Sequence, residues 1–433
     1  MERRKFIKSS ALGAGAITLG ATSALAATRK NKVRIGFIGL GGRGRGLLNE
    51  ILSLDWIEVP AICDINPGAL VSTQEIIQKH GRKKASEYGK DELDYKRLVE
   101  RDDLDAVIIA TYWQWHTPMA VDAMKAGKYV GVEVPAALSI DECWQLVNTS
   151  EETGMPCMMM ENWSFRQDNL AVLNMIREGM FGDMVHCHCA HSHDCIDHWF
   201  FNSKTGEDKW PAEFLVKYNR DQYPTHSLGP VLSWMDIPCG DTFDHITSMA
   251  TEGKGINAMF ADKFGKDHPS TNRKFAQGDI VTSMIRTKMG RSIVVNYDMQ
   301  LPRPYDNRWS IQGTKGIYNE QRTSLYLKDV SPEYHQWEPF APYQDTYNHK
   351  FWKGEYVGGG HGGVDLIELG YFAEAVRDKK NTPVDVYESV LMSCVAALSG
   401  DSIAKGSQPV EVPDFTRGKW KTRKPRFALD MTA

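Results

Sequence analysis

The chain has 433 residues, of which 42% are hydrophobic and 24% are charged, and its formal net charge is −4. This length and composition are typical of a folded protein of two domains with substantial cores. Its 51 basic and 55 acidic side chains are interspersed. No basic surface is therefore expected that could neutralise a phosphate backbone, which excludes nucleic acid as a partner.

Residues 1–26 have the pattern of an export signal. Arg3 and Arg4 precede a modestly apolar stretch, and small residues at 24–26 suit a signal peptidase. Paired arginines followed by Phe and Lys are typical of the twin-arginine pathway, which carries folded cargo. We therefore expect a periplasmic protein. No later stretch reaches the roughly 18 apolar residues of a membrane span, so none is expected in the mature protein.

The next segment has the order of a dinucleotide-binding site. A buried strand at 33–38 leads into Gly39-x-Gly41-x-x-Gly44, and Asp64 follows a second apolar run. The first glycine permits a tight turn, the second lets a pyrophosphate approach the backbone, and the third lets the helix pack on the strand. Asp64 can accept both ribose hydroxyls and would repel the 2′-phosphate of NADP, so NAD is the predicted cofactor.

The pattern of a doubly wound parallel sheet continues after this unit. The apolar run 104–110 is typical of a strand buried on both faces, and the aromatic segment 112–118 follows it directly. Ligands of such sheets bind at the carboxyl ends of the strands. We predict a Rossmann domain over residues 31–161, completed by a helix at 119–126, a strand at 129–132, a helix at 140–153 and a strand at 157–161.

Residues 162–433 are predicted to form an α+β domain with a mostly antiparallel open sheet. Its C-terminal helices could pack back on the first domain. The segment 195–223 is too long for a simple connection and is expected to cover a site. Strands are predicted at 184–191, 280–287, 292–298, 308–312 and 317–318, and helices at 168–178, at 365–377 and from 385 onward.

These features together resemble the Gfo/Idh/MocA superfamily of sugar oxidoreductases over nearly the whole chain. The resemblance implies an N-terminal Rossmann domain, a Glu-Lys-Pro-like turn after the fifth strand, and an open sheet that carries substrate and contributes to homo-oligomers. Two positions depart from it. The usual lysine is Val134, and the usual Asp-x-x-x-His pair falls on His226-Ser-Leu-Gly-Pro230, so the dehydrogenase's lysine and histidine are both missing.

A narrower group is more similar, namely the NAD-dependent glycosidases of glycoside hydrolase family 109, whose known members act on N-acetylgalactosaminides. The matching motifs are Glu133-Val-Pro135, Met159-Met-Glu-Asn162, Tyr223-Pro-Thr-His226, Leu301-Pro-Arg-Pro-Tyr305 and His361-Gly-Gly-x-Asp365. The resemblance implies a small-molecule glycoside substrate. It implies cofactor contacts at Gly42, Arg43, Asp64, Trp113, His116, Glu133, Val134 and Asn162, and sugar contacts at Tyr223, His226 and Tyr305. The group's Arg after a Lys-Trp pair is Pro211 here, which removes a forked donor for sugar oxygens.

The chemistry that this resemblance implies is hydrolysis without net oxidation. Transient oxidation of the sugar at C3 makes the C2 proton acidic, a base removes that proton, the aglycone leaves from C1, water adds, and C3 is reduced again. His226 is the favoured acid/base because imidazole titrates near the operating pH. Tyr223 and Tyr305 could transfer protons or only hold hydroxyls. Glu133 could contact the nicotinamide ribose or assist catalysis, whereas His116 is interpreted as a helix-start residue near the cofactor.

The segment 186–194 is the densest group of metal-ligand residues. Strand alternation places Cys187, Cys189, His191 and His193 on one face. Four such positions span about 20 Å, too far for all to reach one ion at about 2.0–2.3 Å. No metal site is therefore predicted, and His193 is expected to face the sugar pocket. The eight cysteines match no small disulfide framework, and most are interpreted as buried thiols.

Two other functions stay open at this point. One is a periplasmic NAD(P)-dependent sugar oxidoreductase, against which the missing lysine argues. The other is a non-catalytic NAD-bound sugar-binding protein, which predicts sugar binding without bond cleavage.

Overall fold

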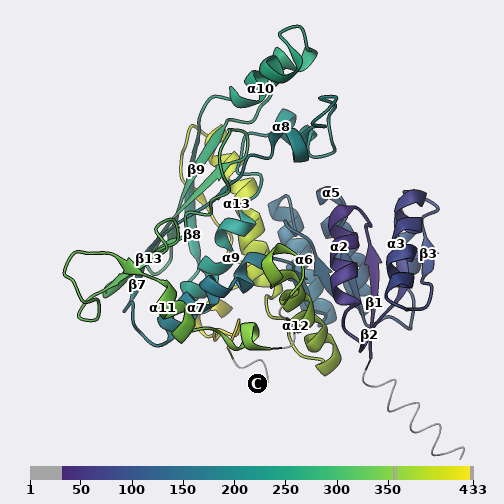
Figure 1. Ribbon diagram of the computed structural model, residues 1–433, viewed down its shortest axis with the longest axis horizontal. Helices are drawn as coiled ribbons and strands as arrows, with labels where there is room; N and C mark the ends of the chain where they lie inside the picture. Colours follow the sequence, from purple (N-terminus) through teal and green to yellow (C-terminus); the bar gives the residue numbers. More distant parts are fainter. Residues whose placement is uncertain (1–31, 355, 357, 430–433) are drawn as a thin grey trace, which may run out of the picture.

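The structure is a computed structural model that describes residues 32–354, 356 and 358–429 (Figure 1). The predicted signal segment, residues 1–26, lies outside the described residues and stays a prediction. Among the described residues, no helix is both long and apolar enough to cross a membrane.

The first domain is a six-stranded parallel sheet with strand order β3-β2-β1-β4-β5-β6, which confirms the predicted Rossmann fold. Its strands are β1 (Val33–Ile38), β2 (Ile57–Cys63), β3 (Ser86–Tyr88), β4 (Ala106–Ile109), β5 (Tyr129–Val132) and β6 (Cys157–Met159). Its helices are α2 (Gly42–Ile51), α3 (Pro67–Lys79), α4 (Tyr95–Val99), α5 (Trp113–Lys125) and α6 (Ile140–Thr153). The strand order reverses between β1 and β4, so the carboxyl ends of these two strands flank the crevice in which such sheets bind dinucleotides.

Helix α5 begins earlier than the sequence predicted. The expected start was Met119, after Pro118, but the helix begins at Trp113 and Pro118 lies inside it. Burial of Trp113, His116 and Thr117 in this first part favours the longer helix, although proline lacks the N–H of one helical hydrogen bond. The aromatic segment therefore packs inward from a helix.

The second domain contains a nine-stranded sheet with order β14-β13-β12-β11-β7-β10-β9-β8-β15. Only β7 and β10 pair in parallel, and the other neighbours are antiparallel. The strands are β7 (Met184–Ser192), β8 (Phe243–Ala250), β9 (Ile280–Thr287), β10 (Ser292–Asp298), β11 (Ser310–Gly313), β12 (Gly316–Asn319), β13 (Ser324–Leu327), β14 (Glu338–Pro339) and β15 (Val410–Glu411). The helices include η1 (Asn162–Phe165), α7 (Gln167–Arg177), η2 (Ile196–Phe200), α8 (Ala212–Lys217), α9 (Thr225–Trp234), α10 (Gly255–Phe264), α11 (Ala341–Thr346), η5 (His361–Gly363), α12 (Val364–Asp378) and α13 (Val386–Ala404).

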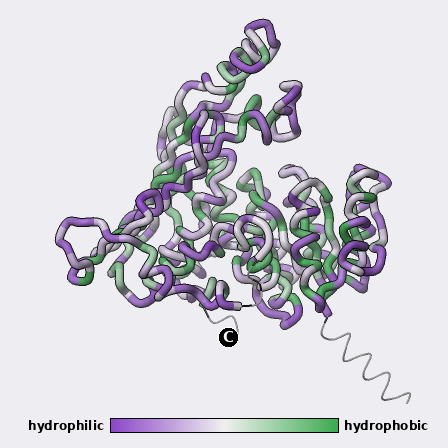
Figure 2. Tube along the Cα trace, viewed as in Figure 1, coloured by the Kyte–Doolittle hydropathy of each residue, from purple (hydrophilic) through white to green (hydrophobic). Residues whose placement is uncertain are grey.

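Helices α12 and α13 join the two domains. Helix α12 packs on α2 and η1, while α13 packs on β8 of the second sheet and on α6 of the first domain. Figure 1 shows both helices between the two sheets, and Figure 2 shows hydrophobic residues along the inner elements of both domains. One buried apolar cluster accordingly extends from Val33 in β1 to Val395 in α13. Groups from both domains can therefore be held in fixed positions around one site.

Candidate active site

The glycine turn after β1 has the geometry that dinucleotide binding requires. Gly39 has a positive φ of 87°, and a Cβ there would lie 2.5 Å from the carbonyl oxygen of Ala110. A Cβ on Gly44 would lie 2.0 Å from the carbonyl oxygen of Gly39. A Cβ on Gly41 or Gly42 would meet nothing within 4 Å. Open space therefore lies before the N-terminus of α2, where unpaired N–H groups favour an anion, and these residues fit the pyrophosphate of NAD.

Asp64 follows β2 and is fixed by the same turn. Its Oδ2 accepts a hydrogen bond from the backbone N–H of Leu40 at 2.6 Å, and its Oδ1 accepts one from Asn66 at 2.8 Å. A carboxylate has about four acceptor positions. Each oxygen therefore keeps capacity for a ribose hydroxyl, and Asp64 fits its predicted role.

Arg43 connects three elements at the edge of this turn. Its Nε donates to Glu133 Oε1 at 2.5 Å and its Nη1 donates to Asp365 Oδ2 at 2.7 Å. Asn162 Nδ2 donates to the other oxygen of Asp365 at 2.9 Å, and His361 Nδ1 lies 2.8 Å from Oδ2. The structure thus brings together the predicted cofactor residues of α2, β5 and η1, and it adds α12 to them.

Electrostatics keep this network charged. Burial alone would lower the pKa of Arg43, but Glu133 and Asp365 more than offset that effect and raise it. Burial would likewise raise the pKa of Asp365, yet the hydrogen bond with His361 and the charge of Arg43 hold it well below its ordinary value. Glu133 is therefore an ion-paired anchor, so the geometry favours a holding role over proton transfer for this predicted catalytic residue.

Two other residues that were predicted to contact the cofactor, His116 and Val134, are buried in the protein. His116 is buried, with Nδ1 2.8 Å from the carbonyl oxygen of Pro135 and Nε2 3.1 Å from that of Thr111. Burial lowers the pKa of His116, although the contacts with the two carbonyl oxygens oppose that effect. The ring links α5 to the turn after β5. Val134 lies in that turn and is 4% exposed, which puts a buried apolar side chain where the dehydrogenases have lysine.

Trp113 is the centre of a cluster of aromatic side chains. Its ring centroid lies 5.5 Å from that of Trp199, 5.2 Å from Trp210 and 4.9 Å from Phe214. These partners belong to the long segment 195–223, which therefore packs over the end of the first domain. Phe200 and Phe201 of the same segment are fully buried and belong to a hydrophobic core.

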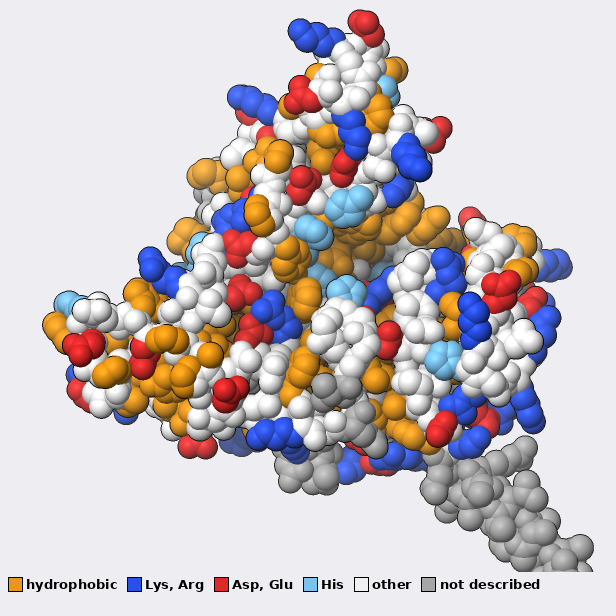
Figure 3. Space-filling model, in the orientation of Figure 1, with side chains coloured by type: hydrophobic (Ala, Val, Ile, Leu, Met, Phe, Trp, Pro, Cys, Tyr) orange, Lys and Arg blue, Asp and Glu red, His pale blue; other side chains and the backbone are white. Residues whose placement is uncertain are grey.

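The predicted substrate residues form one cluster around the buried imidazole of His191. The ring of His226, in the first turn of α9, lies 5.0 Å from Tyr223 and 5.3 Å from His191. Tyr305 lies 4.9 Å from His193 and 5.6 Å from His191. Figure 3 shows histidine and hydrophobic side chains around a hollow between the two domains. The four predicted residues and His191 therefore share one site.

Burial separates the roles of these side chains. It raises the pKa of Tyr223 well above its ordinary value, assisted by Glu133 and Glu161, and it also raises the pKa of Tyr305. Both phenols thus stay protonated and suit hydrogen bonding to sugar oxygens. Burial lowers the pKa of His191 well below its ordinary value, assisted by His226, so His191 is a neutral imidazole.

Sequence reasoning missed two residues of this cluster, Glu161 and His191. Glu161 follows β6 and is fully buried, and its Oε2 lies 2.7 Å from His226 Nδ1. His191 is 4% exposed, and its Nδ1 has no partner among the described residues. Signals for both existed. Glu161 lies in the matched motif 159–162 at the carboxyl end of a strand, and His191 shares a strand face with the predicted His193.

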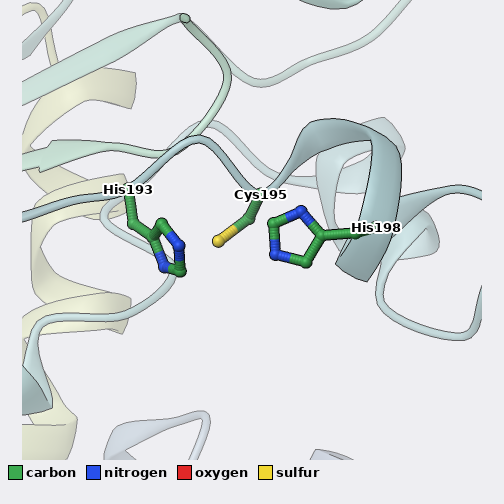
Figure 4. A group of neighbouring side chains, drawn as sticks. All are labelled: His193, Cys195 and His198. Atoms are coloured by element: carbon green, nitrogen blue, oxygen red, sulfur yellow. The ribbon is translucent and has the colours of Figure 1, made fainter. Parts of the chain in front are cut away.

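The fold separates the metal-ligand residues of the segment 186–194. Cys187 and Cys189 are buried in the core. All eight cysteines are buried free thiols, whereas the sequence predicted this of most of them. The side chains of His193, Cys195 and His198 face one another (Figure 4), with their ligand atoms all within 4.8 Å. These three residues could hold a metal ion, and the absence of a metal stays a prediction.

Pro211 and a second cavity lie outside the cluster of predicted site residues. Pro211 is buried at the start of α8, and the adjacent Lys209 donates through Nζ to the carbonyl oxygen of His198 at 2.5 Å. A separate cavity of about 560 Å³ lies beside α6 and α13, where Glu151 pairs with Lys419 and Asp385 pairs with Arg423. None of the predicted site residues lines that cavity, so we do not assign it to the active site.

Comparisons with known proteins identify the family of this chain. Residues 33–161 match the oxidoreductase family with an NAD-binding Rossmann fold, and residues 165–422 match the C-terminal domain of glycosyl hydrolase 109. The chain is 40% identical to a glycosyl hydrolase family 109 protein of Stenotrophomonas maltophilia and 39% identical to an alpha-N-acetylgalactosaminidase of Tannerella forsythia, with 99% of each chain covered in both cases.

Solved structures share the fold at low identity. Levoglucosan dehydrogenase in complex with NADH and levoglucosan has a TM-score of 0.66 at 18% identity, covering 88% of this chain and all of that one. Myo-inositol dehydrogenase from Lactobacillus casei in complex with NAD(H) and myo-inositol has a TM-score of 0.61 at 15% identity, covering 89% of this chain and 99% of that one. Family models and relatives cover nearly the whole chain, which therefore belongs to glycosyl hydrolase family 109 and is a glycosidase whose cofactor is NAD.

Proposed function

We propose that this glycosidase releases terminal N-acetylgalactosamine from glycosides by transient oxidation at C3, elimination across C1 and C2, addition of water and re-reduction. Relatives that carry the name alpha-N-acetylgalactosaminidase support the substrate. The observation that best supports the mechanism is the position of His226. Its imidazole lies in a cluster with His191, His193, Tyr223 and Tyr305, near the glycine turn after β1. A conventional glycosidase needs two available carboxyl groups, but here Glu133 is engaged by Arg43 and Glu161 by His226.

The protein's own groups can perform the proton transfers that this route requires. When bound at Gly42, Asp64 and Asn162, NAD supplies reversible oxidation of the sugar at C3. The His226 imidazole suits removal of the C2 proton and its return, since its side chain is 15% exposed and can exchange protons with water. Tyr223 and Tyr305 are protonated phenols that can hold sugar hydroxyls.

The test is the fate of the C2 hydrogen during hydrolysis of a nitrophenyl α-N-acetylgalactosaminide in D₂O. Elimination must break the C2–H bond, whereas displacement at C1 never touches it. We expect deuterium at C2 of the released sugar, measured by NMR and mass spectrometry. Free product incubated with the enzyme is the control for exchange after release. Product with only protium at C2 would refute the route, and net accumulation of free NADH would instead establish a sugar oxidoreductase.

We also propose that the protein works in the periplasm after twin-arginine export. The support is the sequence of residues 1–26, in which Arg3 and Arg4 form the pair that this pathway reads. Changing both arginines to lysine should hold the precursor in the cytoplasm, as measured by cell fractionation. Unimpaired export of this variant would exclude the twin-arginine pathway.

A further inference from the structure

We propose that Glu161 is a positioning residue that fixes His226 in one tautomer, with the proton on Nδ1 and with Nε2 as the atom that exchanges a proton with the substrate. The last clause rests on the proposed function, whereas the tautomer does not. Glu161 Oε2 lies 2.7 Å from His226 Nδ1, and the other oxygen, Oε1, accepts a hydrogen bond from the backbone N–H of Trp163 at 3.1 Å. Both carboxylate oxygens are therefore in use.

The Glu161 side chain has little freedom to move. It follows β6 and caps the short helix η1 through the Trp163 contact. On its other side it packs against Gly229 of α9, where a Cβ would lie 2.8 Å from Glu161 Cγ and 2.7 Å from Ser164 Oγ. The carboxylate is thus held between a strand end and a helix. Because α9 also carries His226, the same contact sets the distance between the two side chains.

Hydrogen-bonding capacity then decides the tautomer. An ionised carboxylate only accepts hydrogen bonds, so the ring nitrogen that faces it must carry a proton. In a neutral imidazole the other nitrogen then has a free lone pair. With Nδ1 on Glu161, the lone pair of His226 is on Nε2, and the ring's other neighbours are Tyr223, His191 and Trp163. The nitrogen that can act as a base is therefore the one not bound to Glu161.

The burial of Glu161 gives its contact with His226 an electrostatic consequence. The side chain of Glu161 is completely excluded from solvent, and an isolated buried carboxylate is costly unless it is paired. When His226 takes up a proton on Nε2, the resulting imidazolium compensates that charge. The neighbouring acid Glu133 already has Arg43 as its partner. Glu161 therefore stabilises the protonated state that proton removal from the sugar creates, without touching the sugar itself.

The experiment compares Glu161→Gln and Glu161→Asp with the matched control Glu142→Gln. Glu142 is a partly buried carboxyl in α6 that accepts from the backbone N–H of Leu138, away from His226. Nitrogen NMR of protein labelled in its 13 histidines reports the tautomer, with His226→Ala identifying the signal. We expect the Nδ1–H form in the wild-type protein and in Glu142→Gln. In Glu161→Gln the amide can donate to Nδ1, so we expect the Nε2–H form.

Turnover provides a second readout. Glu161→Gln should lower kcat by roughly 10²- to 10⁴-fold, the usual contribution of a positioned acid/base, with KM changed only a few-fold and NAD still bound. Glu161→Asp keeps the charge and should recover part of the loss. A wild-type His226 with its proton on Nε2, or a tautomer unchanged by Glu161→Gln, would overturn the proposal. The NMR readout needs no substrate, so it decides the tautomer even if the proposed sugar is not cleaved.

Discussion

Replacing Gly44 with alanine should destabilise the protein, whereas the same change at Gly46 in the same helix should not. A Cβ on Gly44 would lie 2.0 Å from the backbone oxygen of Gly39, which cannot swing aside as a side chain can, but a Cβ on Gly46 meets nothing within 4 Å. Overpacking costs about 1–3 kcal/mol, and alanine in place of an exposed helical glycine stabilises by up to about 1 kcal/mol. The two variants should therefore differ by about 1–4 kcal/mol in free energy of unfolding.

Gly42→Ala separates cofactor binding from folding. The added methyl group has open space within the protein, so stability without NAD should stay near that of the wild type, while retention of NAD should fall. Denaturant unfolding of protein freed of NAD measures the first quantity, because bound NAD would itself add stability by mass action. Absorbance of the purified protein measures the second. Equal unfolding midpoints for Gly44→Ala and Gly46→Ala, or full NAD retention by Gly42→Ala, would refute this account of the turn.

Four further outcomes are expected. Because Asp64 disfavours a 2′-phosphate, denatured protein should release NAD or NADH, and mass spectrometry that finds mainly NADP would contradict its ribose role. His226→Ala should lower kcat on a nitrophenyl glycoside by roughly 10²- to 10⁴-fold with NAD still bound; near-normal turnover would move the acid/base role to another group. Burial raises the pKa of Asp221 from 3.8 to about 7, so the folded protein keeps a proton that the unfolded chain releases, and stability falls as pH rises through that window. Asp221→Asn should therefore be more stable than the wild type near about pH 8, by at most about 4 kcal/mol, and not near about pH 4; parallel urea titrations showing no such difference would contradict the shift. Dialysis against a chelator should leave kcat unchanged, and a loss that Zn²⁺ restores would reveal a metal site.

The sequence could predict those parts of the fold that depend on local pattern. Strand β4 reads as a continuous apolar run and is buried throughout, as a strand covered on both faces must be. Strand β8 was not predicted, because its pattern mixes buried Ile246 with exposed Met249. Helix α9 was not predicted either, and it contains Gly229 and Pro230, which disfavour helices. Gly229 is required there by its close approach to Glu161, so tertiary packing overrides local propensity.

The site was predictable where a motif marked it and unpredictable where it depends on contacts between elements. The structure brings His193, Tyr223, His226 and Tyr305, which the sequence singled out as candidate sugar contacts, into one cluster. The pairing of His226 with Glu161 joins residues 65 positions apart, one after β6 and one in α9. Periodicity within either element contains no information on that distance. Only the fold, through the packing of α9 against η1, determines it.

The position of proton-transferring groups explains how a dehydrogenase fold can serve a glycosidase. In the turn after β5, residue 134 is a buried valine, and the adjacent Glu133 is neutralised by Arg43. This turn thus offers no free acid or base on the side of the cofactor. The imidazole that can exchange protons comes instead from α9, with its charge partner behind it. We therefore propose that proton transfer to and from the sugar takes place on the side of the C-terminal domain, next to the carbon that the proposed route oxidises. His226→Ala and Glu161→Gln test that location independently of the cofactor turn.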